Sequence, residues 1–210
     1  MRKPTKNECR GLGKALGVMV TTSTRSEDVF KMIPIHKAYE LYLDSNGLSR
    51  EILKDTYFQK YFLAYILLKD MLTISVIRSF LGEEKEIYAN VVNECSDIVE
   101  SSYGKLQALV KNTEIPDLLI EICQGNDFEI MSSFSNFYMF LSADLSEENS
   151  VYYKDFFEND LKQYKELLIK THSLFMSNPE KFADKSGCTA SVILFTLFTG
   201  ASIGTLLFVI

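Results

Sequence analysis

The residue types that most often carry out chemistry in proteins are few in this sequence and stand far apart. The chain contains two histidines, His36 and His172, and neither has cysteines or carboxylates at the short spacings of a zinc site. No GxSxG or HExxH motif is present, and no cysteine stands in a recognisable order with histidine and asparagine. We therefore predict that both histidines occupy polar positions on helix surfaces. The sequence predicts no catalytic residue, no metal site and no cofactor.

Two short segments resemble binding loops, but each lacks a feature that the chemistry requires. DSNGLSRE, residues 44–51, resembles a calcium loop, yet its glycine stands fourth rather than sixth and Glu51 follows too closely. GLGKALG, residues 11–17, has the glycine content of a phosphate loop but lacks the GK[ST] ending and follows no predicted strand. A helical enzyme or effector with its C-terminal tail buried in the fold is therefore only the third of three functional hypotheses.

The four cysteines, Cys9, Cys95, Cys123 and Cys188, are spaced too widely for a zinc knuckle or a CxxC redox pair. Cys9 and Cys188 lie in terminal segments that processing could remove, which would leave Cys95 and Cys123. In an oxidising compartment these two could form a disulfide with a stabilisation of roughly 3–4 kcal/mol. In a reducing compartment they would be two buried free thiols. The sequence favours neither alternative.

Charge is distributed unevenly along the chain. The net charge is -6, and residues 1–25 carry +5 because they contain six basic residues and one acid, so the remainder carries -11. An acidic body argues against a nucleic-acid partner, whose phosphates need a basic surface. We predict that residues 1–25 are a basic arm outside the fold or a divergent leader peptide. The apolar run ALGVMV within them is short for a signal peptide.

Apolar residues at helical spacing predict an all-α fold, an irregular multi-helix bundle over residues 26–183 with a C-terminal hydrophobic helical tail. No stretch alternates between apolar and polar residues as strands do, and only four prolines and ten glycines interrupt the chain. The clearest pattern predicts a helix over about 147–176, in which aromatic and leucine residues recur on one face. Gly47 suits a left-handed helix cap, and Ser49 is placed to cap the helix after it.

Residues 58–81 form the most apolar stretch within the predicted bundle. Four charged residues interrupt the stretch at intervals that the centre of a bilayer would penalise: Lys60, Lys69, Asp70 and Arg78. Between residues 61 and 68 it is nearly apolar on all sides, which is typical of a helix surrounded by others. We predict that it is the central helix of the bundle.

The C-terminal segment differs from that helix because no charged residue follows Lys185. From Thr189 onward it contains 22 residues, enough to cross a hydrocarbon core of about 30 Å at about 1.5 Å per residue. We predict that residues 184–210 direct the protein to a membrane. Gly200 and Gly204 match the small-xxx-small pattern of packed membrane helices, which suggests a homodimer through this tail.

Two modes of attachment fit the tail. A GPI attachment signal combines small residues, a spacer and an apolar end, with Ser186 or Asp184 as the lipid attachment point. The spacer TAS is shorter than the usual 8–12 or so residues. A retained tail anchor instead fits a bundle that faces the cytosol.

The segment FFENDLKQYKELLIKTHSLFMSNPEKFADKSG, residues 156–187, together with its apolar end, resembles the membrane-proximal part of the variable merozoite surface antigens of piroplasm parasites. The resemblance covers about a sixth of the chain. It implies a helical, non-catalytic, GPI-anchored protein of the cell surface that attaches to host cells and varies antigenically, with lipid on Ser186 or Asp184. The first hypothesis is therefore a membrane-anchored surface protein that acts through protein contacts, and the alternative is a tail-anchored, cytosol-facing adaptor.

Overall fold

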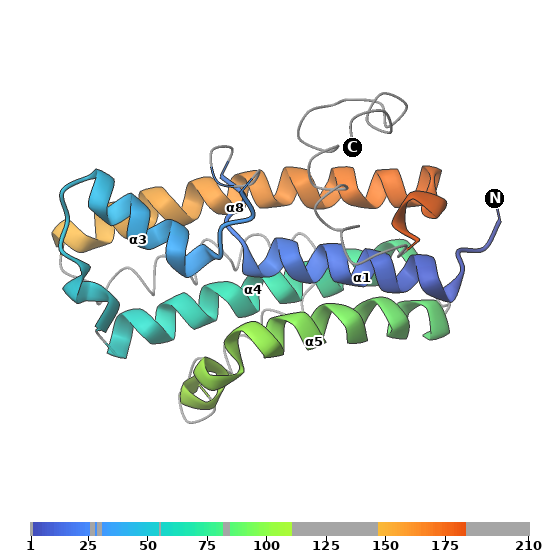
Figure 1. Cartoon of the computed structure of the whole chain (residues 1–210), viewed down its shortest axis with the longest axis horizontal. Helices are drawn as coiled ribbons and strands as arrows, with labels where there is room; N and C mark the ends of the chain where they lie inside the picture. The colour runs from blue at the N-terminus through green and yellow to red at the C-terminus, as the bar shows by residue number, and fades with distance from the viewer. Residues whose placement is uncertain are drawn as a thin grey trace.

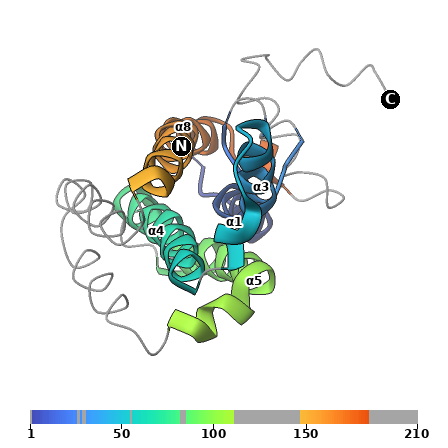
Figure 2. The same cartoon turned by 90° about the vertical axis from the view of Figure 1, so that its left-hand side faces the viewer.

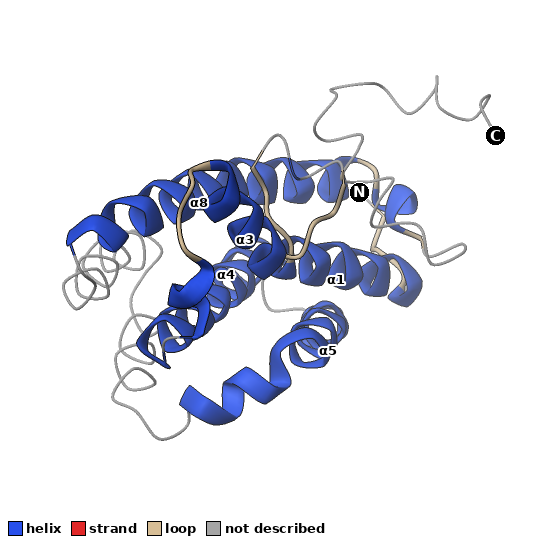
Figure 3. Cartoon of the chain, turned by 60° about the vertical axis from the view of Figure 1, so that its left-hand side comes forward, coloured by secondary structure: helices blue, strands red, loops and turns tan. Residues whose placement is uncertain are grey.

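The described part of the computed structural model is built from helices (Figure 1) and covers residues 2–25, 28, 31–54, 56–81, 85–110 and 147–183. The α-helices are α1 (Lys6–Thr21), α3 (Ile35–Ser45), α4 (Thr56–Leu81), α5 (Lys85–Val110) and α8 (Glu147–Ser177), and the 3₁₀-helices are η1 (Arg50–Lys54) and η2 (Pro179–Phe182). No strand occurs in these ranges (Figure 3), which confirms the all-α prediction for them. The predicted helical tail, residues 184–210, lies outside the described residues.

Four long helices lie side by side, and α3 packs across one end of them (Figures 1 and 2). Helix α1 runs parallel to α5, since Gly13 faces Val91 and Gly17 faces Cys95. Helix α8 runs antiparallel to α1 and parallel to α4. We call the end with α3, η1 and the starts of α4 and α8 the α3 end, and the opposite end the η2 end.

The N-terminal segment lies inside the bundle, contrary to the prediction of an arm outside the fold. Its helix α1 begins with a capping box, in which the Glu8 amide donates to Thr5 Oγ1 and the Thr5 amide donates to Glu8 Oε2 at 2.7 Å. One face is buried and consists of Cys9, Leu12, Ala15, Leu16, Met19 and Val20, while Lys6 and Arg10 remain exposed. The bundle therefore begins at residue 6 rather than at residue 26.

Two glycines let α1 and α5 approach closely. A Cβ atom on Gly13 would lie 2.5 Å from the carbonyl oxygen of Val91, and one on Gly17 would lie 2.8 Å from the Cβ of Ile98. The glycine-rich segment 11–17 thus has a packing role, the same small-xxx-small contact that the sequence suggested only for the tail. An ion pair between Arg10 and Glu94, at 2.9 Å, joins the same two helices.

The buried apolar side chains of the described residues form one continuous core, to which α1, α3, α4, α5, α8 and η2 all contribute. The predicted aromatic face of the last helix lies in this core, since all of its members are buried: Tyr153, Phe156, Phe157, Leu161, Tyr164, Leu168 and Phe175. Helix α4 contacts α5, α1 and α8, but α1 contacts α5, α4, α8 and η2, so the central position predicted for residues 58–81 belongs at least equally to α1. None of the described helices combines the length and the hydropathy needed to cross a bilayer.

Two predicted caps are present between α3 and η1. Gly47 has a φ of +69°, the left-handed conformation that glycine adopts without strain, and its amide donates to the Asp44 carbonyl. The Glu51 amide donates to Ser49 Oγ at 3.2 Å, so Ser49 caps η1, a separate 3₁₀-helix, and not the start of the long helix predicted to follow it. Local sequence signals therefore placed this turn correctly.

The described chain closes at the η2 end. After α8 ends at Ser177, η2 turns back onto α1 and buries Phe182, whose ring packs edge-on against Phe175 with centroids 5.2 Å apart. Arg2 Nη2 lies 3.8 Å from Glu180 and forms a shorter bond with Glu8. Residues at the beginning of α1 and at the end of the described C-terminal part thus meet at the same end of the bundle.

Candidate functional site

A buried ion pair between α4 and α8 is the most highly connected polar group in the described core. Lys69 Nζ lies 3.1 Å from Asp160 Oδ2, and both side chains have 0% exposure. Lys69 also donates to the carbonyl of Thr22 at 3.0 Å. The segment after α1 is thereby joined to α4 and α8 at one point.

Asp160 receives two further donors from different parts of the chain. The Thr24 amide donates to Oδ1 at 2.5 Å, and the Tyr65 hydroxyl donates to Oδ2 at 2.5 Å. Thr24 Oγ1 also donates to the backbone carbonyl of Asp160 at 2.8 Å. Both carboxylate oxygens are therefore satisfied, which is the condition for keeping a charge inside a core.

Tyr164 and Thr73 extend this network by one turn of α4. The Thr73 hydroxyl donates to the backbone carbonyl of Lys69 at 2.7 Å and accepts from the Tyr164 hydroxyl, whose oxygen lies 3.2 Å from the same carbonyl oxygen. The Lys69 ammonium lies 4.5 Å from the centroid of the Tyr164 ring, a distance suited to a cation–π contact. Burial lowers the pKa of Lys69, and Asp160 opposes that effect.

A lysine with a lowered pKa is a group that enzymes use as base or nucleophile. In this bundle neither Lys69 nor Asp160 has any solvent-exposed surface, so no substrate can reach them. We assign the pair a structural role, because it fixes the relative positions of α4, α8 and the segment after α1.

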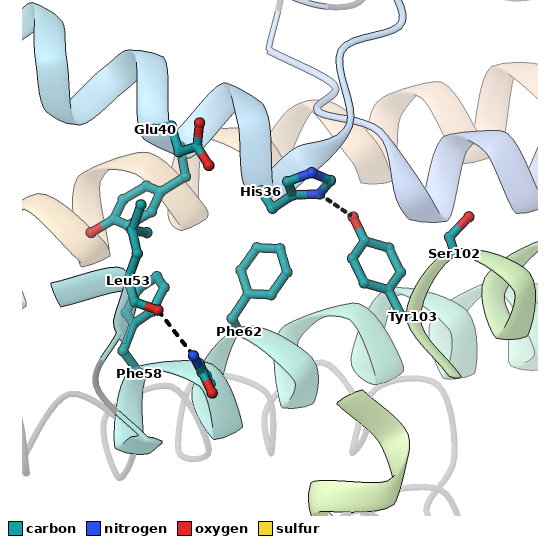
Figure 4. Close-up of a pocket in the computed structure, with 9 residues that line it drawn as sticks. His36, Glu40, Leu53, Phe58, Phe62, Ser102 and Tyr103 are labelled. Atoms are coloured by element: carbon teal, nitrogen blue, oxygen red, sulfur yellow. Dashed lines mark hydrogen bonds between the residues drawn. The ribbon is translucent and has the colours of Figure 1, made fainter. Parts of the chain in front are cut away.

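A cavity of about 320 Å³ opens at the α3 end (Figure 4). Side chains from α3, η1, α4 and α5 line it: His36, Tyr39, Glu40, Leu53, Phe58, Gln59, Phe62, Ser102 and Tyr103. The aromatic rings belong to the core at this end, and the polar groups lie around them. This cavity is the candidate functional site, since pockets of this size and composition bind small molecules.

Hydrogen bonds orient the polar groups of the cavity (Figure 4). The Tyr103 hydroxyl donates to the carbonyl of Thr21 at 3.2 Å, so its oxygen accepts from His36 Nδ1 at 3.4 Å. Gln59 Nε2 donates to the carbonyl of Leu53 at 3.2 Å. Tyr103 thus connects the cavity to the end of α1, and the Gln59 amide is held with its oxygen available.

The carboxylate in the cavity is already paired. Glu40 Oε2 lies 2.6 Å from Lys37 Nζ and 3.7 Å from Arg50 Nη1. Arg50 also pairs with Asp44, and that bond is the largest cause of the lowered pKa of Asp44. The mouth of the cavity therefore carries balanced charges.

The predicted site residues are distributed between the core and the segments outside the described residues. Cys95 is a buried free thiol that donates to Asp70 Oδ1 at 3.6 Å, so of the two alternatives the disulfide has no support here, and its candidate partner Cys123 lies outside the described residues. The predicted lipid attachment and tail-packing residues also lie outside them: Ser186, Asp184, Gly200 and Gly204.

The two histidines are not brought together. His36 is exposed on α3 and lines the cavity, whereas His172 is half-buried on α8, where burial lowers its pKa. Within the described ranges no three histidine, cysteine or acidic side chains are grouped as a metal site would require.

The buried pair and the cavity were missed at the level of sequence. The interruption of an apolar helix by Lys69 was the available signal for a buried charge, but its partner is 91 residues away in the chain. No local pattern distinguishes the cavity-lining aromatics from those that fill the core. Searches of protein-family models, curated proteins and solved structures find no significant match to this chain.

Proposed function

We propose that this chain is a non-catalytic, membrane-anchored helical protein that acts through contacts made by its bundle. The single observation that carries the proposal is the long segment without charges that follows the last described residues of the bundle. Phe182 is fully buried against Phe175, and no charged residue follows Lys185. The 22 uncharged residues from Thr189 onward are enough to cross a bilayer and support the assignment of this segment to a membrane.

The direction of the helices supports a defined orientation at that membrane. The described chain ends at the η2 end, and the cavity opens at the α3 end. Helix α8 has 31 residues and therefore a length of about 46 Å at about 1.5 Å per residue. An anchor in residues 184–210 would hold the cavity away from the bilayer, where a partner in solution or on another cell can reach it.

We favour attachment by a GPI lipid on Ser186 or Asp184 and display on the cell surface, with a protein partner such as a host-cell receptor. The sequence resemblance to the piroplasm antigens and the small residues before the apolar end support this choice. The proposal includes no catalytic role, because the buried pair Lys69 and Asp160 has no access to a substrate.

A tail-anchored adaptor that faces the cytosol is the second candidate. The buried free thiol of Cys95 favours it, because a reducing compartment keeps such thiols free. In this case the tail is retained, and Gly200 and Gly204 can pack two copies together.

Phospholipase treatment of intact cells distinguishes the two attachments. For a GPI protein, a phosphatidylinositol-specific phospholipase releases the bundle, and the double variant Asp184→Phe and Ser186→Phe abolishes surface display. The matched control is Ser173→Phe, at an exposed serine of α8, which we expect to leave display unchanged. Retention after phospholipase, together with a mature chain that still contains residues 189–210, would establish the adaptor. A full-length chain that is monomeric without detergent would exclude both.

A further inference from the structure

We propose that the cavity at the α3 end binds a neutral, planar aromatic molecule that carries one hydrogen-bond donor on its edge. The inference concerns the described bundle alone and holds whether or not the chain is anchored to a membrane.

Aromatic rings determine the shape of the site. Phe58, Phe62 and Tyr103 form a row, with ring centroids 6.2 Å apart between the first two and 5.9 Å apart between the last two. Tyr39 stacks on Phe58 at 5.2 Å, and Leu53 completes the apolar lining. Such surfaces bind flat rings by offset stacking and edge-to-face contacts.

Charge balance excludes an ionic ligand. Glu40 is the carboxylate of the lining, and its charge is offset by Lys37 and Arg50 at its own oxygen. A cationic ligand would have to compete with Lys37 and Arg50, which already lie beside Glu40. An anionic ligand would be repelled by the Glu40 carboxylate. A ligand without net charge avoids both costs.

Three polar groups at the edge of the cavity can accept a hydrogen bond, and the Tyr39 hydroxyl of the lining, which is buried without a hydrogen-bond partner among the described residues, can donate or accept one. His36 uses Nδ1 as a donor to Tyr103, so in the neutral ring Nε2 is left as an acceptor. Gln59 uses its amino group on Leu53, which leaves Oε1 as an acceptor. The Ser102 hydroxyl, exposed on α5, can also accept. One N–H or O–H on the ligand edge can bond to one of these acceptors, and a ligand without a donor would lack that hydrogen bond.

The cavity volume of about 320 Å³ is large enough for a bicyclic ring such as indole. Indole is also a convenient probe, because the protein contains no tryptophan and so contributes no indole fluorescence of its own. We expect indole to bind the full-length chain saturably, with a blue shift of its emission. Indene, which has the same shape without the N–H, should compete more weakly, and neither tryptamine nor indole-3-acetate should compete more strongly than indole.

Two serine variants locate the binding. Ser102→Phe places a ring in the cavity and should weaken indole binding about tenfold or more, a change of ~1.4 kcal/mol. Ser101→Phe is the matched control at the neighbouring exposed serine, which does not line the cavity, and should bind within about twofold of wild type. Helical circular dichroism and the thermal midpoint verify that each variant is folded, and the Ser102→Phe sample also serves as the blank for non-specific partitioning.

A second variant tests the acceptors independently. His36→Phe retains an aromatic ring but removes Nε2, and we expect it to reduce the preference for indole over indene. Unchanged indole binding by a folded Ser102→Phe variant would place the ligand elsewhere and overturn the proposal. Tighter binding of tryptamine or indole-3-acetate than of indole would overturn the assignment of a neutral ligand.

Discussion

Lys69 Nζ of α4 lies 3.1 Å from Asp160 Oδ2 of α8, and neither side chain is exposed to solvent. The two residues are 91 positions apart in the chain. Lys69 also donates to the Thr22 carbonyl, and Asp160 also accepts from Thr24 and Tyr65. A buried pair of this kind contributes little net stability compared with apolar residues of the same size. It does, however, make one alignment of the helices far more favourable than its alternatives, since any shift leaves buried charges unpaired.

Removal of one member of this pair should destabilise the bundle strongly. Asp160→Ala leaves the Lys69 ammonium, the Thr24 amide and the Tyr65 hydroxyl without their acceptor, and we expect a loss of about 3–5 kcal/mol in the free energy of unfolding. Urea unfolding of the full-length chain measures this. The control Glu158→Ala, at an exposed acid of the same helix, should change stability by about 0.5 kcal/mol or less. Similar losses in both variants would refute the structural role of the pair.

Replacing both members of the pair by apolar residues should recover part of that loss in stability. The double variant Lys69→Met and Asp160→Leu removes both charges, so we expect it to be more stable than either single variant. The same unfolding experiment gives the coupling free energy of the two positions. Additive losses would mean that the two side chains do not interact.

Substitution at the contact between α1 and α5 should be poorly tolerated. Gly13→Ala places a Cβ 2.5 Å from the Val91 carbonyl oxygen, so the helices must separate, and we expect a loss of about 1–3 kcal/mol. Gly104→Ala is the control, because its Cβ would meet only the flexible side chain of Glu100, at 3.5 Å. In that helix alanine should stabilise by up to ~1 kcal/mol. Equal effects at the two glycines would contradict the close approach.

The free energy of unfolding should fall as the pH is raised from 4 to 6, because Asp70 loses its proton in this range. Burial raises its pKa from 3.8 to about 6, although the bond from Cys95 opposes this. The folded state therefore holds the proton more tightly than the unfolded state, so the contribution is present below the ordinary pKa and is lost as the pH rises through about 6. We expect a loss on the order of 2 kcal/mol. Asp70→Asn should remove this part of the pH dependence, and an unchanged pH profile in that variant would reject the assignment.

Cys95 should be unreactive in the folded protein. Burial and the neighbouring Asp70 carboxylate raise the pKa of its thiol, so the reactive thiolate is scarce. Alkylation should be slow in buffer and rapid in denaturant without reductant, with peptide mapping to identify the site. A Cys95 to Cys123 cross-linked peptide from the protein in its own compartment would instead favour the oxidising environment of a surface protein.

The helices could be predicted because their signals are local. Apolar residues recur every three or four positions in α8, and caps such as Gly47 and Ser49 act within a few residues. Helix α1 carried a similar signal in Leu12, Leu16 and Met19, but its basic residues led to the prediction of an arm. Its glycines acquire their meaning only against α5, because their effect is to let another backbone approach.

The sequence by itself determined the helical class, the bounds of α8 to within a residue or two, the helix within residues 56–81 and the charge-free character of residues 187–210. Only the tertiary structure decided which helices pair, that Lys69 meets Asp160, and that four elements enclose a cavity next to His36. The physical reason is the separation along the chain of the residues that interact. Helix formation depends on neighbours within one or two turns, whereas a buried ion pair or a cavity depends on side chains that distant segments bring together.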